Sequence, residues 1–331
     1  MAATEMVEDT WASGIRKPGL LLFLAGIAAL SACSAPINNT VHVFDPATCA
    51  NRLAEPYTEF SVTVATEDGR DIPFTVFAPS RAGTYPMAAF SHGAFASPTR
   101  YRALLGPLAG AGYIIIAPMH IDSEEFGSTE RPSPLDTWNT RNEDMALALN
   151  PNVQLAAALA DRTYFVDDTK VASLGHSYGA VIAQIAGGAV ATGPDGAEAR
   201  FLDQDVDAVI GWSPPGIVPG MMAAEGWSSL TAPTMTITGT TDILPGFIDQ
   251  WQAHKATYDY SPVGARALWV GDGINHYFGG MFGREKPADE NSQRLFQRAL
   301  AVSLNYMDRK LGNYEICEIG PAVSGEIYQE D

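Results

Sequence analysis

The chain has 331 residues, of which 46% are hydrophobic and 18% charged, so it can bury a sizeable core in one large domain or two small ones. Its formal net charge of −18 argues against nucleic-acid binding, because phosphates would be repelled, and against electrostatic capture by anionic lipid. The acidic residues are scattered along the sequence, so this charge indicates a solvated surface and predicts no metal site.

The N-terminus is typical of an export signal. A basic pair precedes an apolar run at 20–30, which is shorter than the roughly 20 residues that a membrane-spanning helix needs. The run ends in Leu-Ser-Ala-Cys, which resembles a bacterial lipobox, and this resemblance implies that Cys33 is lipidated and becomes the mature N-terminus. An ordinary secretory peptide with an incidental Cys33 is the alternative. We expect residues 1–32 to be a signal peptide and the mature protein to be a lipoprotein, with Ser34 favouring the outer membrane, facing the periplasm or the exterior.

Two further cysteines, Cys49 and Cys317, lie near opposite ends of the mature chain. In an oxidising compartment they can form a disulfide that joins the two ends, and two buried thiols are the alternative. We favour the disulfide. Residues 33–56 are expected to be a tether leading into the fold. Residues 57–331 show no repeat or linker and are expected to form a single domain.

From residue 57 onward the pattern predicts an α/β fold. An alternating run at 59–65, a turn and a second run at 72–77 predict an antiparallel hairpin at a sheet edge. Apolar runs typical of parallel strands then alternate with amphipathic runs typical of helices. The strands are expected at 85–90, 113–118, 171–174, 206–212, 233–239 and 265–271, and the helices at 101–112, 141–160, 247–258 and 292–311. This order predicts a mostly parallel central sheet with helices on both faces.

The sequence Gly-His-Ser-Tyr-Gly at 175–179 predicts a sharp turn between a strand and a helix of small residues, with Ser177 at its tip. In such a nucleophile elbow the glycines remove Cβ atoms that would clash, and the serine is strained with its hydroxyl exposed above the sheet. The motif alone is weak, because Gly and Ser gather in surface turns, but here the flanking strand and helix supply the context. Ser177 is therefore the candidate nucleophile.

A serine hydroxyl needs a base to take its proton, and the base needs an orienting carboxylate. Sites in open α/β sheets form at the carboxyl ends of strands, so these partners should directly follow strands downstream of Ser177. Asp242 and His276 meet this condition and give the chain order Ser, Asp, His. Asp272 is the rival acid, but it lies so close in sequence to His276 that we expect it to cap the loop.

The other histidines are weaker candidates. His120, which follows a strand together with Asp122, is the competing base. The same pair is a poor metal site, because two ligands do not make one, and no metal is expected. His254 falls in a predicted helix away from the strand ends and should be solvated. His176 should point away from the serine hydroxyl, and His92 should form a hydrogen bond behind the oxyanion turn.

Acyl transfer also needs N–H donors for the developing oxyanion. One is expected from Tyr178, the residue after the nucleophile, and the other from the loop after the strand at 85–90. Ala94 is the preferred donor in that loop, and Phe95 is the alternative. Phe95 and Ile243 are also the expected substrate-binding residues.

The phrases FSHGAF, LAGAGYIIIAPMH and GHSYGA resemble the α/β-hydrolase superfamily, nearest to platelet-activating-factor acetylhydrolase and dienelactone-hydrolase-like esterases. A more distant similarity to bacterial cutinases and polyester hydrolases lies in the order WSSLTAP, TMTITGTTD and VGDGINH. The resemblance covers about residues 57–311 and implies an α/β-hydrolase fold and Ser-His-Asp ester hydrolysis without a cofactor. The chain departs from cutinases at its His-Gly-Ala turn, where they carry an aromatic oxyanion residue, and at Tyr178, where they often carry methionine.

The sequence thus predicts a serine carboxylesterase that acts through a covalent acyl-enzyme on short-acyl, lactone or lipid-type esters. Alternatives on the same fold are a polyester hydrolase and a serine peptidase or amidase. A membrane-tethered binding module is the non-enzyme alternative, and it is disfavoured because such proteins usually lack a triad residue. The expected partners are an ester substrate and, through the N-terminal lipid alone, a membrane, with no nucleic acid.

Overall fold

The computed structural model describes residues 47–331 apart from 68, 128–131, 134–135, 193–197, 200–204, 284–288 and 314–315. Contacts divide the chain into Met1–His42 and Val43–Asp331, and every described residue belongs to the second unit. The predicted signal peptide, the lipidation site Cys33 and the first part of the 33–56 tether lie outside the described residues. Within the described part, no helix is both long and apolar enough to cross a membrane.

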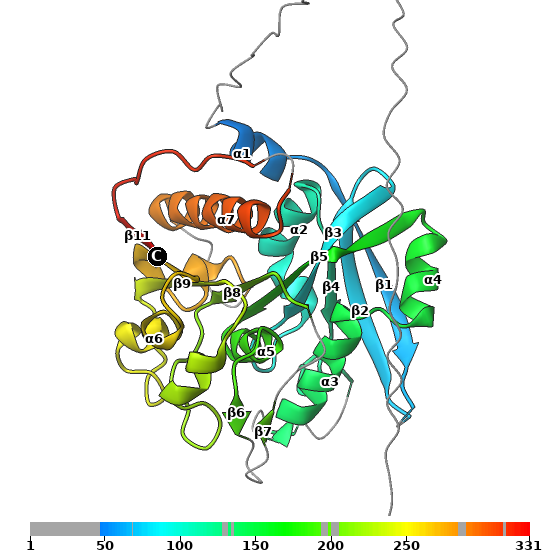
Figure 1. Cartoon of the computed structure of the whole chain (residues 1–331), viewed down its shortest axis with the longest axis horizontal. Coiled ribbons are helices and arrows are strands. Elements are labelled where there is room, and N and C mark those ends of the chain that lie inside the picture. The colour runs from blue at the N-terminus through cyan, green and yellow to red at the C-terminus, as the bar shows by residue number, and fades with distance from the viewer. Residues whose placement is uncertain are drawn as a thin grey trace, which may run out of the picture. The chain divides into compact units, whose positions relative to one another are not determined.

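Nine strands of the described chain form one sheet in the order β1-β2-β4-β3-β5-β8-β9-β10-β11 (Figure 1). Their bounds are β1 Tyr57–Ala65, β2 Asp71–Pro79, β3 Gly83–Ser91, β4 Ile114–Pro118, β5 Tyr164–His176, β8 Ala208–Trp212, β9 Thr234–Thr241, β10 Arg266–Asn275 and β11 Glu326–Glu330. The strands from β4 to β10 pair in parallel, whereas β1 and β2 at one edge and β11 at the other pair antiparallel. The predicted mostly parallel sheet with an antiparallel N-terminal hairpin is confirmed.

Helices cover both faces of this sheet, as predicted (Figure 1). One face packs against α1 (Ala47–Leu53), α2 (Arg102–Gly110) and α7 (Glu290–Lys310), and the other against α3 (Trp138–Leu149), α4 (Val153–Ala160), α5 (Tyr178–Ala186) and α6 (Ala256–Tyr260). Short elements are the 3₁₀ turns η1 (Pro98–Tyr101), η3 (Ala224–Ser229), η4 (Trp251–Lys255) and η5 (Phe278–Gly280) and the ribbon of β6 (Ala191–Thr192) and β7 (Glu198–Ala199). Because both faces are covered, every residue of β4 and β8 is buried.

Several elements differ from the sequence prediction, among them α1 within the expected tether, the unpredicted ribbon of β6 and β7, and β5, which begins at Tyr164. The helix expected at 141–160 is two helices, because Pro151 disfavours helical backbone at the preceding residue and Asn152 caps α4 by accepting the N–H of Leu155. The helix expected at 247–258 is the 3₁₀ turn η4 followed by the short α6. Strand β11 was not predicted, because it is short, mostly polar and paired on one side only.

The predicted disulfide between Cys49 and Cys317 is present and joins α1 to the segment after α7, with the two Cα atoms 4.9 Å apart. It closes a loop with a sequence separation of 268 residues. For so long a loop, the chain-entropy model gives about 5 kcal/mol of stabilisation as an upper figure. The bridge therefore fastens the start of the described chain to its end.

We expect the double variant Cys49→Ser/Cys317→Ser to lose about 2–5 kcal/mol of unfolding free energy, because its unfolded chain is no longer cross-linked. Urea unfolding followed by fluorescence measures the loss. Wild-type protein unfolded with a reductant present serves as the control and should show the midpoint of the double variant. A midpoint that the reductant leaves unchanged would contradict the disulfide.

Candidate active site

The turn between β5 and α5 holds Ser177 in a strained backbone conformation, with φ 52° and ψ −122°. A Cβ atom on Gly175 would collide with the carbonyl of Gly179, and one on Gly179 would collide with the carbonyl of Ser91. Both glycines of the motif are therefore required for the chain to turn this tightly. The geometry is that of the predicted elbow, with the serine between the end of a strand and the start of a helix.

Ser177, His276 and Asp242 lie in one hydrogen-bonded row. The Ser177 Oγ is 3.0 Å from His276 Nε2, and His276 Nδ1 is 2.8 Å from Asp242 Oδ1. A carboxylate only accepts, so Nδ1 carries the imidazole proton and Nε2 is left to accept the proton of the hydroxyl. Thr238 donates to the second carboxylate oxygen of Asp242 at 2.7 Å and fixes its orientation. This arrangement can activate a serine hydroxyl as a nucleophile.

The sheet brings the three residues together. β5, β9 and β10 are parallel members of one sheet and end at the same edge, so the residues that follow them meet there. The register of β10 against β9 shifts between Gly271 and Asn275, just before His276. A Cβ atom on Gly239 would collide with the bulged backbone at Ile274, so this position in β9 needs glycine. The rival acid Asp272 instead accepts a hydrogen bond from Thr240 at 2.8 Å in an exposed position.

Asp242 is fully buried and interacts with two histidines. Burial alone would raise its pKa, but the contacts with His254 and His276 hold the pKa well below its usual range, so the side chain is a carboxylate. By distance these three side chains are also the described group that could hold a metal ion, since their ligand atoms lie within 4.8 Å of one another. An ion bound there would compete with the contact between Asp242 and His276 on which a general base depends.

The expectation that His254 is solvated is wrong. The side chain lies fully buried in η4, with Nε2 2.9 Å from Asp242 Oδ1 and Nδ1 2.6 Å from the carbonyl oxygen of Pro214. The error has a physical cause, because the position of η4 against the end of β9 is a tertiary contact that helical periodicity does not report. No local signal in the sequence marks this histidine.

His176 points away from the serine hydroxyl, as predicted, and is part of a hydrogen-bonded chain. Its Nε2–H donates to the carbonyl oxygen of His276 at 2.9 Å, and its Nδ1 accepts from the Tyr101 hydroxyl at 2.9 Å. The Tyr101 oxygen accepts in turn from the N–H of Gly93 at 3.0 Å. Burial lowers the pKa of His176 well below its usual value, so this ring is neutral. Tyr101 was missed in the sequence, although it links the expected oxyanion loop to the backbone of His276.

The competing base, His120, forms a second Ser-His-Asp row. Its Nε2 is 2.9 Å from Ser91 Oγ, and its Nδ1 is 2.9 Å from Asp144 Oδ2. All three side chains are at most 1% exposed, and none of them lines the cavity described below. Burial, followed by the charge of Arg141, holds the pKa of His120 well below its usual value. The row at His120 is therefore buried away from the cavity, whereas Ser177 and His276 of the other row line it.

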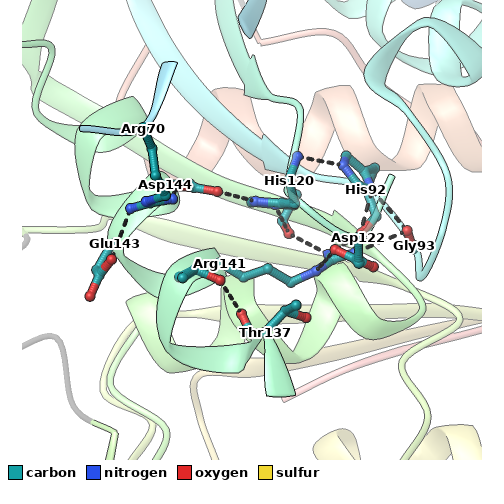
Figure 2. A network of polar contacts seen from close by, with 11 residues as sticks. Arg70, His92, Gly93, His120, Asp122, Thr137, Arg141, Glu143 and Asp144 are labelled. Carbon is teal, nitrogen blue, oxygen red and sulfur yellow. Dashed lines mark hydrogen bonds and ion pairs between the residues drawn. The ribbon is translucent and has the colours of Figure 1, made fainter. Parts of the chain in front are cut away.

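A buried arginine supports the loop after β3 from behind (Figure 2). Arg141 contacts both carboxylate oxygens of Asp122, at 2.9 and 2.8 Å, and donates to the carbonyl oxygens of His92 at 2.6 Å and Gly93 at 3.2 Å. Burial alone would raise the pKa of Asp122, but Arg141 holds it well below its usual range. Asp122 thus pairs with an arginine, and it also accepts a hydrogen bond from the N–H of Phe95 at 3.1 Å.

These bonds bear on the choice of oxyanion donors. The N–H of Gly93 donates to the Tyr101 hydroxyl and the N–H of Phe95 donates to the Asp122 carboxylate, so both amides already have acceptors within the protein. The N–H of Phe95, the alternative oxyanion donor, is thus engaged by Asp122, and Ala94 and Tyr178 stay predictions as donors. Ala94 and Tyr178 line the same cavity as Ser177, and the guanidinium carbon of Arg141 stacks 4.5 Å from the centre of the Tyr178 ring.

A cavity of about 510 Å³ opens at Ser177 and His276. Its apolar wall includes Phe95, Val218, Met221, Leu244 and Phe247. No Asp, Glu, Lys or Arg is among its lining residues in the part of the chain that the structure describes. Of the two predicted substrate-binding residues, Phe95 lines the cavity and Ile243 does not. The Ile243 side chain is 46% exposed, and the neighbouring residue Leu244 lines the cavity instead. The cavity suits an apolar, uncharged ligand.

Comparison with known proteins gives one family. The family model for chlorophyllase matches residues 44–215, which include the strained serine and the loop after β3. Among solved structures, the chain is similar to a Klebsiella pneumoniae protein assigned as a dienelactone hydrolase, with 17% identity, a TM-score of 0.49, and coverage of 74% of this chain and 97% of that one. No curated protein matches the chain. Because the family model spans more than half of its length, the chain belongs to the chlorophyllase family, a family of α/β-hydrolases.

Proposed function

We propose that the protein is a serine carboxylesterase for uncharged esters with an apolar group. The observation that carries the proposal is the Ser177–His276–Asp242 row, which opens into an apolar cavity. Membership of a hydrolase family supports the reaction type.

In the proposed mechanism, Ser177 Oγ attacks the ester carbonyl while His276 Nε2 takes its proton. The N–H groups of Ala94 and Tyr178 stabilise the oxyanion of the tetrahedral intermediate. His276 then gives the proton to the departing alcohol, which leaves an acyl-enzyme on Ser177. Water then attacks the carbonyl of the acyl-enzyme while His276 takes its proton. As the second tetrahedral intermediate collapses, the acid leaves and His276 returns the proton to Ser177 Oγ.

The cavity supports an apolar ester over the alternatives. A site that recognises peptide termini needs charged or strongly polar groups, and none of the described lining residues is an Asp, Glu, Lys or Arg. A volume of about 510 Å³ exceeds the space that an acetyl group fills, so lipid-type or lactone esters fit the site at least as well as short-acyl ones. Neither the polyester nor the peptidase alternative has an observation of its own in its favour.

We further propose that the enzyme is exported and tethered by lipid at Cys33, with residues 57–331 as its single catalytic domain. The disulfide between Cys49 and Cys317 supports export, because such bonds persist in oxidising compartments. The lipobox-like sequence at the end of the apolar run supports the tether.

The test is active-site titration with a fluorophosphonate, together with turnover of p-nitrophenyl esters of increasing acyl length. We expect one label per wild-type molecule, and we expect Ser177→Ala to abolish both labelling and turnover. Ser91→Ala is the matched control, because it removes the hydroxyl of the buried Ser-His-Asp row and should still be labelled. Labelling of folded Ser177→Ala, or no labelling of folded wild type, would contradict the assignment of Ser177 as the nucleophile.

A further inference from the structure

Two stretches of the chain resemble each other, Ile-Val-Pro-Gly-Met-Met at 217–222 and Ile-Leu-Pro-Gly-Phe-Ile at 243–248. The first follows β8 and the second follows β9, and these two strands are parallel neighbours in the sheet. Both stretches therefore lie near the edge of the sheet at which Ser177 and His276 meet. Neither of them contributes a residue to the row of Ser177, His276 and Asp242.

Each stretch folds into the same tight turn, with proline and glycine at its tip. The N–H of the residue after the glycine donates to the carbonyl of the residue before the proline at 2.9 Å, from Met221 to Val218 and from Phe247 to Leu244. The glycines, Gly220 and Gly246, have φ values of 77° and 80°. Proline followed by a glycine of positive φ is the pattern of a type II turn, in which the proline fixes its own φ and the glycine adopts its conformation without strain. Because each turn is also closed by an antiparallel bridge, its shape is set before any ligand binds.

The two turns form an apolar rim around part of the cavity. Five of their residues are in the cavity wall, namely Val218, Pro219, Met221, Leu244 and Phe247. Ile217 and Ile243, which begin the two stretches, are 51% and 46% exposed, and Phe247 is 61% exposed although it lines the cavity. Neither stretch contains a charged residue, in a chain whose net charge is −18. Exposed apolar side chains that gather at a site in this way are typical of ligand binding.

We propose that the two turns form a preformed subsite for a hydrocarbon chain of the ester substrate, and that they set the preference of the enzyme for long over short esters. The inference rests on the proposed esterase function. A chain that extends outward from Ser177 meets Phe247, which belongs both to the cavity wall and to the exposed surface. Covering this ring and the two isoleucines removes apolar surface from water, which favours binding. The rigid turns lose little conformational freedom when the chain binds.

The composition of the rim favours such a chain over a charged ligand. A carboxylate, phosphate or ammonium group has no ion-pair partner in either stretch, because neither contains Asp, Glu, Lys, Arg or His. The surface of an anionic membrane is repelled by the net charge of −18. A neutral hydrocarbon chain covers the rim without leaving a charge buried and unpaired.

The test compares long and short esters in Phe247→Ser, which keeps the backbone N–H that closes the turn. Because contact with several methylenes is lost, kcat/KM for p-nitrophenyl octanoate or for octyl acetate should fall by about tenfold, whereas p-nitrophenyl acetate and ethyl acetate should change by less than about twofold. Phe165→Ser is the matched control and should change none of these values. Phe165 is 52% exposed, and it lies at the start of β5, at the opposite end of the strand from Ser177.

All esters are kept below their critical micelle concentrations, so that the ligand is a single chain. An equal change for long and short esters in folded Phe247→Ser would overturn the proposal. A loss that occurs only above the critical micelle concentration would also overturn it, because the turns would then bind the surface of an aggregate. Ile217→Ser changes the other turn and should give a smaller loss, again for the long esters alone, so it takes the place of Phe247→Ser if that variant does not fold.

Binding of octyl acetate to Ser177→Ala, measured by titration calorimetry, gives a readout that does not depend on turnover. Adding Phe247→Ser should raise the Kd by about tenfold, and adding Phe165→Ser should leave it unchanged. Equal Kd values with and without Phe247→Ser would overturn the proposed subsite even if the wild type hydrolyses esters. If the wild type hydrolysed no ester but the Kd changed as expected, the esterase function would be overturned and the subsite would stand.

Discussion

Replacing Asp242 by Asn should lower kcat for ester hydrolysis by about 10⁴-fold, with KM little changed, because the carboxylate acts on the orientation and tautomer of the base and not on substrate binding. Asp242 accepts the Nδ1–H of His276 at 2.8 Å, which leaves Nε2 to accept from Ser177. An amide NH₂ in its place can donate to Nδ1, so that the ring proton moves to Nε2. A protonated Nε2 can no longer accept the proton of the Ser177 hydroxyl. Steady-state kinetics on a p-nitrophenyl ester measures the loss.

Asp272→Asn is the matched control for this variant. Asp272 lies at the same edge of the sheet, but it is exposed and accepts from Thr240, so kcat should stay within about twofold of wild type. Thermal unfolding establishes that both variants are folded. If Asp272→Asn lost as much activity as Asp242→Asn, the assignment of the acid would have to be reversed.

The three residues of the Ser177 row could be predicted because each depends on local sequence. The glycines at 175 and 179 report a tight turn, and Asp242 and His276 stand directly after apolar strands, so strand pairing alone brings them to one edge. The parallel sheet and its hairpin could be predicted for the same reason, since side-chain periodicity within each strand reports which faces are buried. Strand β11 lacks such a signal, because it lies at the sheet edge and is mostly exposed.

His254 and Arg141 could not be predicted, because nothing in their own neighbourhoods distinguishes them. Both lie on predicted helices, where a charged or polar residue usually faces solvent. Only the packed structure places His254 against the carboxylate of Asp242 and Arg141 beneath the loop after β3. In each case the partner is a buried carboxylate, Asp242 or Asp122, and the sequence does not show that this carboxylate is buried and paired.

Arg141→Met should lower the free energy of unfolding by about 3–5 kcal/mol at about pH 7, because it leaves the Asp122 carboxylate buried without its cation. It also removes the donors to the carbonyls of His92 and Gly93. The folded-state pKa of Asp122 lies below its unfolded value, so the carboxylate contributes stability above about pH 4 that is lost as the pH falls. The variant should therefore differ most from wild type near neutrality and least in acid, as urea unfolding at two pH values would show.

Two controls separate this effect from the loss of any arginine. Arg100→Met removes a partly exposed pair with Glu124 at 2.7 Å and should cost no more than about 1 kcal/mol. Arg141→Met/Asp122→Asn should recover part of the loss, because the neutral amide no longer needs a cation. If Arg141→Met cost no more than Arg100→Met, the pair would not carry stability.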